Sequence, residues 1–118
     1  MRYVDGFVLP VPEKNLQAYC RMAQKAGKIW REHGALDYKE CAGDDLKAKG
    51  TVSFPRTVKL KGEKVFFSWI VYKSRAHHNR VNAEVMKDRR LGKMMDPKAM
   101  PFDLKRMVYG GFKILVEA

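Results

Sequence analysis

The sequence predicts an α+β fold in which four antiparallel strands carry two helices on one face of their sheet. Stretches rich in β-branched and aromatic residues alternate with two stretches of helical periodicity, in the order β, α, β, β, α, β. A long connection separates the second strand from the third. This order is that of the split βαβ, or ferredoxin-like, arrangement, and we expect residues 1–118 to form one such domain.

The strand predicted over residues 64–72, KVFFSWIVY, is the most strongly patterned segment of the chain. Side chains alternate between the two faces of a strand. One face carries Val65, Phe67, Trp69 and Val71, and the other carries Phe66, Ser68, Ile70 and Tyr72. Both faces are apolar, so both must be covered.

The first strand, residues 3–11, is also apolar on both faces, and Asp5 is its one charged residue. A carboxylate in such a strand needs a partner or must be neutralised. Asp5 is either a paired or solvated residue near the strand end, or a functional group. The helix that follows begins at Pro12 and Glu13 and ends at Gly34. Its apolar stripe comprises Leu16, Tyr19, Cys20, Ala23, Ala26 and Trp30.

Residues 35–42 alternate as in a strand with one wetter face, and residues 43–63 form a turn-rich connection that is a candidate lid. Phe54, Val58 and Leu60 share one parity, which favours a short extended segment within this connection. Ser74 caps a second helix over residues 75–88, and a short helix is expected within residues 88–100. The last strand, residues 107–116, contains Gly110 and Gly111, which predict a bulge or a close backbone approach.

The formal net charge is +11, which raises nucleic acid as a partner. The basic residues form two zones, residues 47–64 and 75–98, and no ribonucleoprotein signature, KH loop or zinc knuckle accompanies them. We expect a solvated basic surface, with RNA binding as the alternative. Cys20 and Cys41 do not suggest a disulfide framework, and no apolar run approaches the roughly 20 residues that span a bilayer. These features favour a cytoplasmic protein that does not bind membranes.

The two helices account for only one face of the sheet. At about 25 cal/mol per Å², leaving roughly 700 Å² of apolar surface in water forgoes on the order of 15 kcal/mol. Single subunits seldom expose patches of that size. Because no strands remain in the chain, we expect a second copy to supply the covering sheet, as a homodimer whose two sheets pack as an α/β barrel. Phe66, Phe67, Trp69, Ile70 and Phe112 are the predicted core and dimer residues.

Several stretches together carry a resemblance to a known family: YVDGFVLPVP, HGAL, SFPRTVKL, VFFSWIVYKSRAHHNRVNAEVM and MPFDLKRMVYGGF. They resemble the YbaA-like bacterial family of unknown function over nearly the whole chain. One departure is Arg89, where the family pattern has a proline. The resemblance implies the dimeric α/β-barrel superfamily, which includes cofactor-free monooxygenases, haem-degrading enzymes and isomerases of small cyclic acids. Such fold analogy does not assign an activity.

A pocket between sheet and helices is the predicted site for a small-molecule ligand or substrate. Asp5 or Asp103 would act as a base, and Tyr109 would donate a hydrogen bond. The predicted binding residues are Ser68, Arg106 for an anionic group, and His77 or His78 at the rim. Alternatively, Asp103 and Arg106 form a structural ion pair, and one histidine is packed while the other is solvated. No metal-ligand spacing occurs, and we expect no metal and no cofactor. A non-catalytic dimeric scaffold or regulator is the third possibility.

Overall fold

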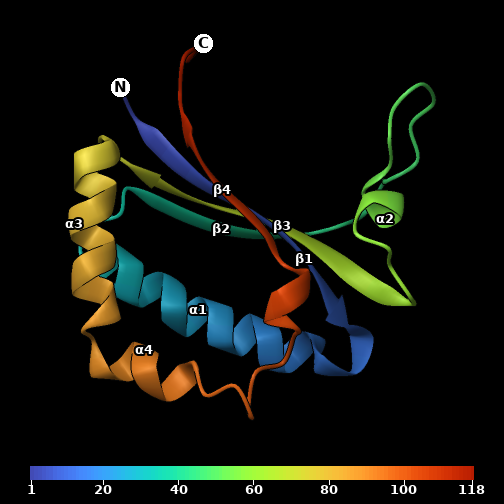
Figure 1. Cartoon of the computed structure of the whole chain (residues 1–118), viewed down its shortest axis with the longest axis horizontal. Coiled ribbons are helices and arrows are strands. Elements are labelled where there is room, and N and C mark those ends of the chain that lie inside the picture. The colour runs from blue at the N-terminus through green and yellow to red at the C-terminus, as the bar shows by residue number, and fades with distance from the viewer.

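A four-stranded antiparallel sheet with the strand order β2-β3-β1-β4 forms one layer of the computed structural model, which describes all 118 residues (Figure 1). The strands are β1 (Tyr3–Pro12), β2 (Asp37–Ala42), β3 (Glu63–Tyr72) and β4 (Val108–Lys113). β3 pairs with both β1 and β2, and β1 also pairs with β4. This is the predicted ferredoxin-like topology, and the fold class is therefore confirmed.

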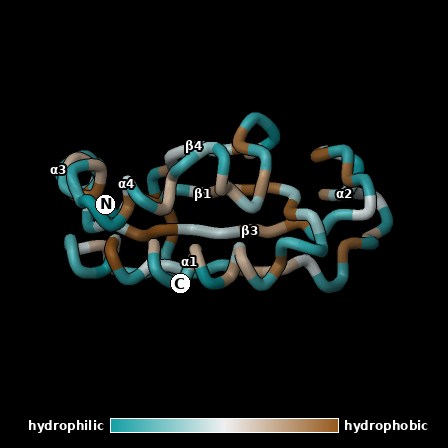
Figure 2. Tube along the Cα trace, turned by 90° about the horizontal axis from the view of Figure 1, so that it is seen from below, coloured by the Kyte–Doolittle hydropathy of each residue, from teal (hydrophilic) through white to brown (hydrophobic).

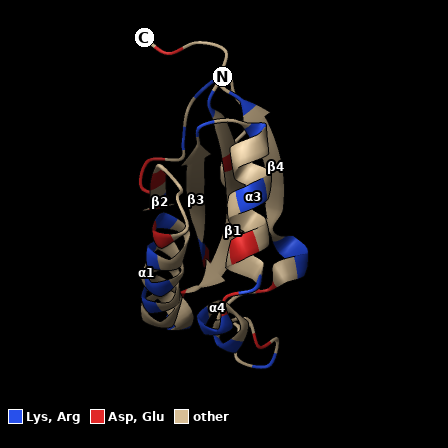
Figure 3. Ribbon diagram, turned by 90° about the vertical axis from the view of Figure 1, so that its left-hand side faces the viewer, with Lys and Arg blue, Asp and Glu red and all other residues tan.

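Helices cover one face of this sheet. They are α1 (Leu16–Glu32), α3 (Arg75–Met86) and the short α4 (Arg89–Met94), which lie together in front of the strands in Figure 3. The connection from β2 to β3 contains α2 (Phe54–Thr57) and projects from the far end of the sheet in Figure 1. Two single 3-10 turns, η1 (Glu13–Asn15) and η2 (Leu104–Arg106), precede α1 and β4.

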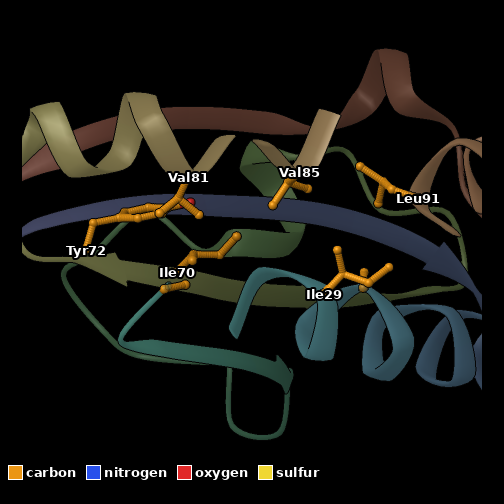
Figure 4. Close-up of a cluster of buried hydrophobic side chains, with 8 residues drawn as sticks. Ile29, Ile70, Tyr72, Val81, Val85 and Leu91 are labelled. Carbon is orange, nitrogen blue, oxygen red and sulfur yellow. The ribbon is translucent and has the colours of Figure 1, made fainter. Parts of the chain in front are cut away.

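The core lies between the sheet and the helices, in two clusters. The larger one joins Ile29 of α1, Ile70 and Tyr72 of β3, Val81 and Val85 of α3, and Leu91 of α4 (Figure 4). The smaller one contains Leu9, Val11, Tyr19, Ala23 and Phe66. Phe66 and Ile70, which the strand alternation places on one face, therefore belong to the helix-side core. Hydrophobic residues occur along both β1 and β3 in the Cα trace (Figure 2).

The opposite face of the sheet is open. Phe67, Val108 and Phe112 are 46%, 55% and 59% exposed, and Trp69 beside them is half-buried. The indole N–H of Trp69 donates to Oδ2 of Asp37 at 3.3 Å. Three of the predicted core and dimer residues, Phe67, Trp69 and Phe112, thus lie on a surface that the single chain leaves uncovered.

Two local predictions are wrong, and the structure decides between the two explanations that the sequence gave for a third feature. Cys20 is exposed, because the buried stripe of α1 instead runs through Tyr19, Ala23, Ala26, Gly27 and Ile29. The segment around Phe54 forms α2 rather than an extended stretch, because Ser53 caps it by accepting a hydrogen bond from the backbone N–H of Arg56. The register between β1 and β4 runs without a break from Tyr3–Lys113 to Val8–Val108, so β4 contains no bulge.

The paired glycines of β4 instead permit a close approach. A Cβ atom on Gly111 would lie 2.2 Å from the Tyr3 hydroxyl, and one on Gly110 would lie 3.2 Å from the Phe112 ring. Position 111 favours glycine because the Tyr3 side chain lies against the backbone of β4 at that point. Of the two explanations that the sequence allowed, a bulge or a close approach, the close approach is therefore the one observed.

Candidate functional site

A cavity of about 350 Å³ lies between the sheet and the helices. Its floor is the covered face of the sheet, where Asp5, Glu40, Ser68 and Tyr109 come from four different strands. Most of its other lining residues are apolar, and its roof includes five methionines, Met22, Met86, Met94, Met95 and Met107. An apolar cavity with a few convergent polar groups is typical of small-molecule sites.

Asp5 is the centre of the first polar group on the floor. Its side chain is only 3% exposed. The hydroxyl of Tyr109 donates to Oδ1 at 2.8 Å, and that of Tyr72 donates to Oδ2 at 3.1 Å. Asn82 of α3 supports Tyr72 by donating from Nδ2 to its hydroxyl oxygen at 3.1 Å. The chain thus satisfies the buried carboxylate with neutral donors from β3 and β4.

His78 also approaches Asp5, although it is not among the residues that line the cavity. Its Nε2 is 3.0 Å from Oδ2 of Asp5, but this buried nitrogen has no aligned hydrogen-bond partner. The contact is therefore electrostatic when the imidazole is charged. The ring is held between Tyr3 and Tyr72, with centroid distances of 5.0 and 4.8 Å. Asp5, Tyr109 and His78, predicted from the sequence as site residues, do come together.

Burial of Tyr109, together with its hydrogen bond to Asp5 and the charge of that carboxylate, raises the pKa of Tyr109 to about 12. Burial likewise raises the pKa of Tyr72, which lies deeper. Both hydroxyls therefore remain protonated donors at neutral pH. The pair of Asp5 and Tyr109 places an acceptor and a donor of protons side by side at the cavity floor.

Glu40 of β2 forms a second polar group, which the sequence analysis did not identify. The hydroxyl of Tyr19 donates to Oε1 at 2.8 Å and that of Tyr38 donates to Oε2 at 2.9 Å. Burial raises the pKa of Glu40, although hydrogen bonds from Tyr19, Tyr38 and Ser68 oppose the shift. The only sequence signal was that Tyr38 and Glu40 share a parity, which placed them together on one face of the strand.

Ser68 lies on β3 opposite Glu40 and is 4% exposed, so this predicted residue is part of the floor. His77 is not. It is buried on another side of α3, where its Nδ1 accepts a hydrogen bond from the backbone N–H of Lys73 at 3.0 Å. Burial, with the charges of Arg80 and Lys73, lowers the pKa of His77. The expectation of one packed and one solvated histidine is therefore wrong, since both are packed.

Asp103 and Arg106 lie outside the cavity lining. Asp103 is exposed and caps η2, because its Oδ1 accepts a hydrogen bond from the backbone N–H of Lys105. Arg106 pairs with Glu63 and donates to the carbonyl of Lys59 at 3.0 Å. The alternative of a mutual ion pair between Asp103 and Arg106 is thus corrected, because Glu63 takes the guanidinium. Arg106 is consequently held away from any ligand in the cavity.

The connection over residues 43–62 contributes no residue to the cavity lining, so the structure gives it no role as a lid. The described chain contains no group of three or more His, Cys, Asp or Glu side chains arranged to hold a metal ion. None of its helices is both long and apolar enough to cross a bilayer.

Comparisons with known proteins place this cavity in a family without an assigned activity. The family model described as "Protein of unknown function (DUF1428)" matches residues 2–104. The chain is 41% identical over 118 residues to "Uncharacterized protein YbaA" of Escherichia coli strain K12, covering 99% of both chains, and equally to the protein of that description in Shigella flexneri.

Among solved structures, the chain is similar to an uncharacterized NIPSNAP domain protein from Burkholderia xenovorans. The TM-score is 0.55 at 12% identity, covering 98% of this chain and 94% of that one. It is also similar to the de novo designed protein Foldit4, with a TM-score of 0.50 at 9% identity, covering 97% and 99%. At these identities the likeness concerns the fold alone.

Proposed function

We propose that this chain, which belongs to the DUF1428 family of proteins of unknown function, is a homodimer that binds a small, largely apolar molecule and catalyses a proton transfer on it. The observation that carries the proposal is the buried carboxylate of Asp5 on the floor of an apolar cavity. Folded proteins rarely bury a carboxylate, and those that line a cavity are candidates for a functional site.

Asp5 is the proton acceptor in this proposal. It takes a proton from the bound molecule and returns it at a second position, which amounts to an isomerisation. Tyr109 donates a hydrogen bond to Oδ1 of Asp5 and is half exposed, so its hydroxyl can turn from the carboxylate to the ligand. The largely apolar lining lowers the local polarity, which strengthens both interactions. No bound metal or organic cofactor is required for this chemistry.

The test begins with a ligand-observed NMR screen of small molecules against the whole protein. Hits are then incubated with the protein in D₂O, and deuterium incorporation into carbon-bound positions is followed by NMR. Catalysed exchange is the expected result. The variant Asp5→Asn should bind the same hits and lose the exchange, because an amide cannot accept the proton at neutral pH.

The matched control for this variant is Asp103→Asn, which makes the same chemical change outside the cavity and should keep the exchange. Binding without exchange in the wild-type protein would remove the catalytic part of the proposal and leave a binding protein. A screen without hits, in a protein of normal thermal stability, would contradict the proposal as a whole.

The homodimer is supported by the open face of the sheet. This face is apolar, and its exposed residues include Phe67, Val108 and Phe112. A stable interface buries about 800 Å² per partner and is depleted of charge at its centre. The only lysine whose parity places it on this face, Lys39, already pairs with Asp37. A second copy of the same apolar face is therefore a better occupant than a polyanion.

Sedimentation of the wild-type protein and of Phe112→Asp tests this point. We expect a dimer for the wild type and a monomer for the variant, since a carboxylate buried at an interface is costly. A wild-type monomer that binds single-stranded RNA, with the binding weakened in Lys87→Ala, would instead favour the RNA alternative through the basic zones. Loss of RNA binding in Phe112→Asp, but not in Lys87→Ala, would place the RNA on the sheet.

A further inference from the structure

The cavity differs in charge from the rest of the molecule. The chain has 24 lysines and arginines against 13 aspartates and glutamates, yet no lysine or arginine lines the cavity. Its charged lining residues are Asp5 and Glu40 alone. Arg106, the one cation that the sequence placed in a pocket, pairs with Glu63 elsewhere. An anionic ligand would therefore meet two carboxyl groups and no lysine or arginine.

The two carboxyl groups are separate points on the floor. Asp5 pairs with Ile70 on one side of β3, and Glu40 pairs with Ser68 on the other. With strands about 4.8 Å apart and about 3.3 Å per residue along each, their backbones lie roughly 12 Å apart. A ligand that fills the cavity can therefore reach one acid at each end, with an apolar body between them.

Glu40 retains the capacity to bind a ligand. Each of its oxygens accepts one tyrosine hydroxyl, from Tyr19 and from Tyr38, whereas a carboxylate offers about four lone-pair sites. Asp5 is more fully occupied, because Tyr72, Tyr109 and His78 surround it. Both carboxyl groups keep acceptor sites, and Glu40 differs from Asp5 in having no imidazole beside it.

Aromatic rings stand beside this end. Trp30 and Tyr38 lie with ring centroids 6.3 Å apart, and both line the cavity together with Tyr19. The faces of such rings attract a cation, and a carboxylate next to them adds charge-assisted hydrogen bonds. Aromatic walls around an acid are the arrangement that recognises an ammonium group.

We propose that the cavity selects a small amine, with an aromatic or aliphatic body that fills the apolar volume and an ammonium group that binds Glu40. This inference rests on the proposed function, because it specifies the class of molecule that the same cavity binds. It also runs against the superfamily analogy, which implied isomerases of small cyclic acids. Glu40 is then the residue that determines charge specificity, while Asp5 and Tyr109 supply the chemistry.

Matched triplets of probes test the inference. Each triplet has one body and three heads, for example 2-phenylethylamine, 2-phenylethanol and 3-phenylpropionate, with corresponding sets on indole and cyclohexyl bodies. Dissociation constants are measured by protein-observed NMR titration of the full chain near neutral pH. We expect the amine of at least one triplet to bind about tenfold or more tightly than its acid, as a charge-assisted contact provides.

The variant Glu40→Gln should reduce the affinity for the amine by about tenfold while leaving that for the alcohol nearly unchanged. Glu117→Gln, which removes the same charge from the exposed C-terminal tail outside the cavity, should leave both unchanged. Chemical-shift changes in the wild type should centre on Tyr19, Tyr38 and Trp30, which are near Glu40.

Two results would overturn the inference. If the acids bind as tightly as the amines, charge selection is wrong and the proposed binding function stands. If no triplet binds while the broader screen returns hits of other chemistry, the amine class is wrong and the cavity still has a ligand. Only a broader screen without hits would contradict the proposed function itself. Failure of the amine inference can therefore be distinguished from failure of the proposed function.

Discussion

The hydroxyl of Tyr109 donates to Oδ1 of Asp5 at 2.8 Å, which joins the edge strand β4 to a carboxylate buried in the middle of the sheet. The two residues are 104 positions apart in the chain. This bond therefore links the edge strand β4 to β1 through side chains and completes the polar group on the cavity floor.

The first prediction concerns that bond. Tyr109→Phe leaves Asp5 with one neutral donor fewer, and we expect the free energy of unfolding to fall by about 1 kcal/mol, as for a typical lost hydrogen bond. Urea denaturation measures the change. Tyr3→Phe is the matched control, because the Tyr3 hydroxyl packs against Gly111 rather than against Asp5. Equal stability of the two variants would show that the Tyr109 bond does not hold β4.

The second prediction concerns Gly27 in α1. A Cβ atom at this position would lie 2.7 Å from Cδ1 of the Tyr38 ring, so alanine must displace the ring. Gly27→Ala should lower the free energy of unfolding by about 1–3 kcal/mol, which is the usual cost of overpacking. It should also weaken the bond from Tyr38 to Glu40 and thus the binding of any ligand at that end.

Gly92 in α4 is the matched control for Gly27. Nothing lies within 4 Å of a Cβ atom built there, so alanine brings only its better helix propensity. We expect Gly92→Ala to raise the free energy of unfolding by about 0.5–1 kcal/mol. A stabilising effect of both substitutions would mean that Tyr38 moves freely and does not fix Glu40.

The third prediction concerns the pH dependence that Glu40 confers. Burial raises its pKa above the ordinary value of 4.5, so folding favours the protonated carboxyl. The stabilising contribution is fully present below the unfolded value and is lost as pH rises through the folded pKa. Because glutamine does not titrate, the stability of the wild type relative to Glu40→Gln should fall as the pH rises above the unfolded value of 4.5.

Urea denaturation at a series of pH values measures this difference. The stability of Glu117→Gln should follow the wild type throughout, because that carboxylate is exposed. If the difference between the wild type and Glu40→Gln does not change with pH, the carboxyl is not desolvated as the structure indicates.

The fourth prediction concerns His77, whose pKa is lowered from the ordinary value of 6.5 by burial and by neighbouring positive charges. Its neutral ring accepts the N–H of Lys73. The corresponding stability is present above the unfolded pKa of 6.5 and is lost as pH falls through the folded value. His77→Asn, which keeps a side-chain acceptor, should lose less stability on acidification below that value. NMR titration of the imidazole gives the pKa directly, and a midpoint at or above 6.5 would contradict the prediction.

The fold could be predicted from the sequence because its apolar patterns are strong. The residues of β1 and β3 alternate between faces without interruption, so the parity of Asp5, Ser68 and Ile70 placed all three on the side that the helices cover. Tyr109 joined them because β4 pairs with β1 through position 109 opposite Phe7.

The remaining site residues depend on contacts between distant parts of the chain. The sequence did not single out Glu40, and the contact with Tyr19 of α1 that makes it part of the site joins distant parts of the chain. Arg106 is 43 residues from Glu63, and nothing local distinguishes that partner from Asp103. Cys20 and Ala23 are both small and apolar, so the sequence could not fix the rotation of α1 that exposes one and buries the other.

The methionine-rich roof and the acidic floor come from different parts of the chain, and this separation has an evolutionary consequence. Asp5, Glu40 and Ser68 are fixed by strand pairing, and moving any of them would disturb the sheet. Met94, Met95 and Met107 lie at the end of α4 and in the segment leading to β4, where exchange for other apolar residues reshapes the cavity at little cost to the fold. Relatives that share this sheet can therefore differ in the shape of the cavity while keeping the same acidic residues on its floor.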